Sequence, residues 1–136
     1  MRHKKFTAIV GSSILALIFG LSINTAVQAQ TDNKQSSPTL KAMLVDAENK
    51  AKKQAATVEV KVTGIAIIDP AKVKEQPRKG QGHFHYQVDD GPIIATTAPK
   101  LSFHGLTPGQ HKIVVMLAGN DHNPLGPQET LNVTIP

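Results

Sequence analysis

The chain has 136 residues, no cysteine and a formal charge of +5. The absence of cysteine excludes disulfides, a lipid-anchored lipoprotein and a cysteine nucleophile. Three basic residues, Arg2, Lys4 and Lys5, lie in the first 29 residues, which contain no acidic residue, so loss of that segment lowers the charge from +5 to +2. The basic character of the whole chain is therefore a weak argument for nucleic-acid binding, which we do not expect.

The first 29 residues predict a secretory signal peptide. They have a positive start, an apolar stretch over 6–23 and small residues at 27–29. The alternative is an uncleaved membrane anchor, because the apolar stretch approaches the ~20 residues of a spanning helix. The polar Asn24 and Thr25 and the small-residue site favour cleavage before Gln30. We expect a periplasmic or secreted protein with no membrane contact after cleavage.

Two further segments precede the predicted sheet region. Residues 30–37 are polar and lack aliphatic side chains, which predicts a disordered tether. Ser37-Pro38 has the form of a helix start, with a capping serine and a proline at the first helical position. Apolar side chains then follow at helical spacing: Leu40, Met43, Leu44, Ala47 and Ala51. This pattern predicts a short amphipathic helix over 38–55, which either covers a sheet edge or spaces the domain from the tether.

From residue 56 onward the hydrophobic period becomes alternating. Val58, Val60 and Val62 share one face, and Gly64 interrupts the alternation before a group of isoleucines, which suggests a bulge in a long first strand. Shorter predicted strands follow at 83–88, 93–96, 101–103, 111–118 and 130–135, with turn sequences between them. The pattern predicts an all-β fold, an immunoglobulin-like antiparallel β-sandwich over 56–136.

The segment 71–82 carries four cations, Lys72, Lys74, Arg78 and Lys79, among proline and glycine residues. Such a group could attract an anion. We favour a solvated loop, because no aromatic residue is interleaved to stack a base.

Two resemblances rest on short motifs. Residues 106–111, Leu-Thr-Pro-Gly-Gln-His, resemble the Leu-x-Pro-Gly-x-Tyr corner of fibronectin type III and related sandwiches, with His111 where tyrosine is usual. Residues 80–136 resemble a family of secreted bacterial domains of unknown function, marked by Gly-His-x-His, Pro-Gly-x-His and Asp-His-x-Pro. These motifs stand here at 82–85, 108–111 and 121–124. The second resemblance implies a fold and a set of histidines but no activity.

Five histidines remain after residue 29, and His83 and His85 form the clearest pair. Residues two apart in a strand share a face, so both imidazoles project together while Phe84 and Tyr86 face the core. We expect the two histidines on the outer surface, close enough to hold one Zn(II) or Cu(II) ion.

A good site needs more than two donors. The candidates are His122, in the polar loop 119–124, and His104; Asp121 is a further ligand or a support for His122. His111 is expected to be structural, with a ring nitrogen bonded to a backbone group, and Met116 is expected in the core rather than as a copper ligand.

These observations favour an exported binding domain that holds copper or zinc through surface histidines. The alternative is a metal-free adhesive or interaction module for a protein or a cell-surface polymer. A small metalloenzyme with an open coordination position is a third hypothesis. A binding role is favoured over an enzymatic one, because the sequence contains no Gly-x-Ser-x-Gly elbow and the adjacent Asp89 and Asp90 make a poor acid–base pair.

Overall fold

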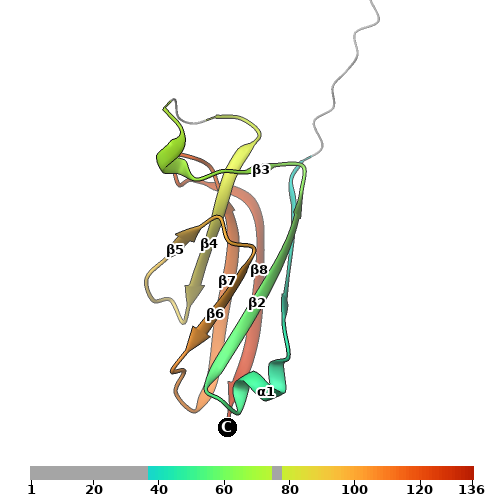
Figure 1. Cartoon of the computed structure of the whole chain (residues 1–136), viewed down its shortest axis with the longest axis vertical. Coiled ribbons are helices and arrows are strands. Elements are labelled where there is room, and N and C mark those ends of the chain that lie inside the picture. The colour runs from blue at the N-terminus through green and yellow to red at the C-terminus, as the bar shows by residue number, and fades with distance from the viewer. Residues whose placement is uncertain (1–36, 75–77) are drawn as a thin grey trace, which may run out of the picture. The chain divides into compact units, whose positions relative to one another are not determined.

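The computed structural model describes residues 37–74 and 78–136 (Figure 1). The expected signal peptide over 1–29, and all but the last residue of the expected tether over 30–37, lie outside the described residues. Within the described residues no helix is long and apolar enough to cross a membrane.

The described elements are mostly strands. In chain order they are β1 (Thr39–Leu44), α1 (Ala47–Ala51), β2 (Ala55–Thr63), β3 (Ala66–Ile67), the 3-10 helix η1 (Pro70–Lys72), β4 (Gln81–Val88), β5 (Ile94–Thr96), β6 (Lys100–His104), β7 (Gly109–Ala118) and β8 (Pro124–Ile135). One sheet has the order β1-β2-β6; the other has the order β3-β4-β7-β8, with β5 also paired to β4. All pairs are antiparallel except β3 with β4. The predicted all-β sandwich is confirmed.

The core lies between the two sheets, which face each other in Figure 1. It follows from alternation along the strands, since every second side chain of β2, β4 and β7 points inward. The fully buried members include Val58, Phe84, Tyr86, Ile113, Val115 and Leu117. Tyr86 donates its hydroxyl proton to the carbonyl of Ala98 at 3.0 Å, and burial raises its pKa to about 12. Because Phe84 and Tyr86 fill the core, His83 and His85 face the other side of β4.

The expected helix over 38–55 is wrong for most of its length. Residues 39–44 form strand β1, which pairs with β2 from Thr39 opposite Thr63 to Leu44 opposite Val58. Leu40, Ala42 and Leu44 point inward, so the segment satisfies a period of two as well as a helical period. Pairing with β2 therefore outweighs local helix propensity. Only Ala47–Ala51 is helical, and the sandwich begins before residue 56.

The expected bulge at Gly64 is also wrong. Gly64 has a φ of 76°, a left-handed conformation that glycine adopts without strain, and the first long strand ends just before it. The following residues leave the first sheet and form β3, which pairs with β4 in the second sheet. Ile68 continues this contact, since its N–H donates to the carbonyl of Gly82 at 2.8 Å. The chain thus passes directly alongside the histidine strand.

Candidate metal centre

The structure brings together three of the four candidate histidines. His83 and His85 lie two apart on β4, as predicted from the period of a strand. His122 belongs to the 119–123 loop, which connects β7 to β8. Because Ala118 lies opposite His83 in the β4–β7 register, this loop begins beside the histidine strand. We call His83, His85 and His122 the histidine triangle.

Three ring nitrogens of the histidine triangle point at one another. The Nε2 atoms of His83 and His85 are 2.9 Å apart. The Nδ1 atom of His122 lies 3.2 Å from each of them. His122 therefore presents a different ring nitrogen from the other two residues.

No arrangement of protons satisfies these three contacts at once. A ring nitrogen either carries a proton and donates, or has a lone pair and accepts. Among three mutually touching nitrogens at least two must be in the same state. Two lone pairs repel each other, and so do two N–H groups, so at least one side of the triangle is always unfavourable. A cation bound to all three lone pairs removes the conflict.

The size of the triangle suits a transition-metal ion. An ion at the usual Zn–N distance of about 2.0–2.1 Å from each nitrogen would lie roughly 1 Å from the plane that they define. The angles between its bonds would be about 90–100°, between octahedral and tetrahedral values. Such an ion keeps at least one coordination position that these histidines do not fill.

Burial favours the neutral form of His83 and His85. The exposed fractions are 0% for His83 and 6% for His85, so the expectation that they are surface histidines is wrong. Burial, and then the neighbouring His85 and His122, lowers the pKa of His83 to about 4 despite the opposing effect of Asp69. Burial and His122 also lower the pKa of His85. Neutral imidazole is the form that binds a metal, so both residues are ready to bind at neutral pH.

The 119–123 loop is held by a local set of hydrogen bonds. Gly119 donates its N–H to the carbonyl of Asn123 at 2.8 Å, and His122 donates its own to the carbonyl of Gly119 at 2.9 Å. His122 itself is exposed and has a φ of 63°, a left-handed conformation that costs free energy outside glycine. The closed loop thus imposes the backbone geometry that turns His122 toward β4.

Asp121 supports this loop through Asn123. Its Oδ1 accepts the Asn123 N–H at 3.1 Å, and its Oδ2 accepts the Asn123 amide at 2.8 Å. These bonds lower the pKa of Asp121. Both carboxylate oxygens are therefore engaged, which favours the supporting role for Asp121 over the ligand role.

Gly82, which precedes the histidine pair, is required by close packing. A Cβ atom at this position would lie 2.6 Å from the carbonyl oxygen of Ala118 and 2.9 Å from Cδ1 of Ile65. The glycine therefore lets β3 and the end of β7 close around the strand beside His83. This explains in physical terms the first residue of the Gly-His-x-His sequence.

His104 is not part of the histidine triangle. It lies exposed on β6, opposite Ala55 in the other sheet. Met116, expected in the core, instead lies opposite His85 in the β4–β7 register, where paired residues share a face, and it is only partly buried. The face of Met116 could not be predicted from the sequence, because β7 carries apolar side chains on both faces.

Asn120 was not singled out by the sequence, yet it is fully buried beside the triangle. Its amide donates to Oε1 of Gln81 at 3.2 Å. Its Oδ1 and the Nδ1 of His83 are buried without a hydrogen-bond partner among the described residues. Burial of a polar side chain next to a histidine loop was the only available signal, and it depends on tertiary structure.

His111 has the structural role that was predicted. It starts the inward-facing side of β7, and its Nε2 bonds to the carbonyl oxygen of Thr107 at 2.7 Å. Its Nδ1 lies 2.5 Å from Oδ2 of Asp89, in the turn after β4. Both nitrogens face oxygen atoms that accept hydrogen bonds, which favours the doubly protonated ring. These two contacts, that with Thr107 first, raise the pKa of His111.

Comparison with known proteins identifies the family of the chain. Residues 52–136 match the model of a family of unknown function, DUF6130. The chain belongs to the DUF6130 family. No curated protein and no solved structure matches it. Membership in DUF6130 agrees with the expected family of uncharacterised domains, and the matched segment contains the whole histidine triangle.

Proposed function

We propose that this DUF6130 protein is an exported metal-binding domain that holds one Zn(II) or Cu(II) ion through His83, His85 and His122. The observation that carries the proposal is the triangle of nitrogens 2.9–3.2 Å apart, in which protons alone leave a repulsive contact. Imidazole nitrogen is a preferred ligand of both metals. The export part rests on the pattern of the first 29 residues.

The site combines a rigid part with an accessible part. Two ligands sit on a buried strand, and the third sits on an exposed loop. Such a division supports uptake and release through the loop while the strand fixes the geometry. We therefore favour storage, delivery or sensing of the ion over catalysis.

The test is calorimetric titration of the purified chain with Zn(II) and with Cu(II). The variant of choice is His122→Ala, because His122 is exposed and its loss leaves no buried cavity. His104→Ala is the matched control, since it removes an exposed histidine from the other sheet. We expect one ion per chain, a loss of affinity of at least about 100-fold in His122→Ala and no change in His104→Ala.

Absence of binding to either metal, or equal losses in the two variants, would contradict the proposal. The metal-free interaction module would then be the better hypothesis. Purifying the chain from the periplasm or medium of an expressing bacterium tests export at the same time, since the mass shows whether residues 1–29 have been removed.

A further inference from the structure

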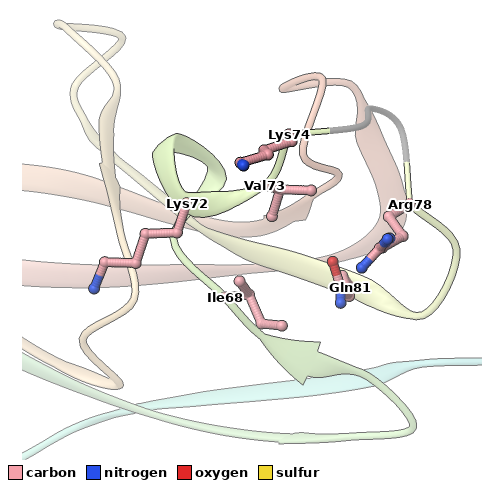
Figure 2. A pocket seen from close by; sticks show the side chains of 6 residues that line it. All are labelled: Ile68, Lys72, Val73, Lys74, Arg78 and Gln81. Atoms are coloured by element: carbon pink, nitrogen blue, oxygen red, sulfur yellow. The ribbon is translucent and has the colours of Figure 1, made fainter.

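A second feature of the described chain is a pocket of about 440 Å³ next to β4, lined by Ile68, Lys72, Val73, Lys74, Arg78 and Gln81. Figure 2 shows Arg78 next to Gln81, Lys74 and Val73 above Ile68, and the Lys72 side chain extending away from the other five. Its volume falls in the range of small-molecule sites. Among the described residues that line the pocket, three are cations and none is acidic.

The two lysines of this pocket, Lys72 and Lys74, have no ion-pair partner among the described residues. The nearby carboxylate of Asp69 is not among the lining residues, and it caps η1 by accepting the N–H of Ala71 at 3.0 Å. Cations gathered around a hollow raise the local concentration of anions.

The pocket and the histidine triangle are neighbours on one strand. Gln81, His83 and His85 alternate along β4, so all three side chains lie on the same face. Gln81 lines the pocket and also accepts a hydrogen bond from Asn120 of the 119–123 loop at 3.2 Å. The Gln81–Asn120 pair therefore links the pocket to the loop that positions His122.

We propose that this pocket binds a small oxyanion beside the metal centre. The anion would be held by Lys74 and Arg78, with Lys72 adding positive charge at the edge of the pocket, and would benefit from the positive charge of an ion in the histidine triangle. Only this coupling rests on the proposed function. Anion binding by the metal-free protein tests the pocket alone.

The experiment uses inorganic sulfate as the probe and the full chain stripped of metal with EDTA. Calorimetry at low ionic strength compares the wild type with the double variant Lys72→Gln/Lys74→Gln. The matched control is Lys41→Gln/Lys61→Gln, which removes the same charge from two exposed residues that face each other in the other sheet. We expect saturable binding of one sulfate, weakened about tenfold or more in the pocket variant and about unchanged in the control.

Two results would overturn the pocket site: no saturable binding to the wild type, or equal weakening in both double variants, which would show a general effect of net charge. The coupling is tested by repeating the titration after loading with Co(II). We expect tighter sulfate binding and a change in the visible Co(II) spectrum. An unchanged sulfate affinity would contradict the coupling. Sulfate binding without any metal binding would contradict the proposed function and leave the pocket site supported.

Discussion

The histidine triangle and the His111 corner place the same side chain in opposite surroundings. At the corner, both ring nitrogens face oxygens, those of Thr107 and Asp89, and the pKa is raised. In the triangle, the nitrogens face one another, and the pKa of His83 is lowered to about 4. The atoms around the ring therefore decide whether a histidine holds protons and stabilises a turn, or offers a lone pair to a metal.

Zinc binding is expected to give the largest change in the free energy of unfolding, and this change should depend on the histidine triangle and not on the His111 corner. At a Zn(II) concentration of about 100 times its Kd, the free energy of unfolding should rise by about 2.7 kcal/mol, and EDTA should reverse the change. Urea denaturation measures this. His111→Tyr should show the same increment and His122→Ala none. An increment that survives in His122→Ala would mean that the ion binds elsewhere.

Removal of the corner histidine should weaken the fold without touching metal binding. His111→Ala loses a bond to a backbone carbonyl and a bond to Asp89, so we expect the free energy of unfolding to fall by about 1–3 kcal/mol. Urea denaturation and zinc titration are run on the same variant. A large loss of zinc affinity would show that the two sites are not independent.

Gly82→Ala should damage both the fold and the triangle. The added methyl group would meet the Ala118 carbonyl and push apart the strands beside His83. We expect a loss of about 1–3 kcal/mol in the free energy of unfolding, together with weaker zinc binding. A variant as stable as the wild type, with full affinity, would show that the close contact is not required.

Each site should make the stability depend on pH in its own direction: the histidine triangle should lower it at acid pH, and the His111 corner should lower it at alkaline pH. In the metal-free protein His83 and His85 have lowered pKa values, so their contribution is complete above the unfolded value of 6.5 and is lost at lower pH, for His83 as pH falls through about 4. His111 has a raised pKa, so its contribution is complete below 6.5 and is lost at higher pH. Denaturation at a series of pH values should therefore show declines on both sides. His111→Tyr should abolish the alkaline decline and leave the His83 decline between pH 6.5 and about 4 in place. If the alkaline decline persists, another group causes it.

The smallest expected change in the free energy of unfolding is that of His122→Ala in the metal-free protein, and it tests the repulsion within the histidine triangle. In EDTA, His122→Ala should change the free energy of unfolding by less than about 0.5 kcal/mol, or raise it slightly. With one nitrogen removed, His83 and His85 share a single proton in an ordinary hydrogen bond. A loss as large as that of His111→Ala would show that the three nitrogens stabilise the metal-free protein.

Local patterns were sufficient to predict part of this molecule. The period of two placed His83 and His85 on one face, and the corner sequence predicted the backbone bond of His111. Burial was not predictable, because it depends on the contact of β4 with the 119–123 loop, which is distant in sequence. The same limit explains the strand in place of a helix at 39–44, where pairing with β2 decides between two periods that the sequence satisfies equally.

His104 and Met116 illustrate the remaining errors. Both depend on which strands are neighbours: His104 belongs to the sheet that lacks the triangle, and Met116 lies opposite His85. Neither fact is encoded in the spacing of nearby residues. The positions of His104 and Met116 relative to the histidine triangle follow from the sheet order and the strand register, not from the motifs.

The most direct test of the metal centre is a zinc titration followed by long-range ¹H–¹⁵N NMR of the imidazole nitrogens. We expect three nitrogens to take the chemical shift of a metal-bound lone pair: Nε2 of His83, Nε2 of His85 and Nδ1 of His122. The chemical shifts of the His104 and His111 nitrogens should stay unchanged. Binding through His104, through Nε2 of His122, or at none of the three nitrogens would show that the histidine triangle is not the metal site.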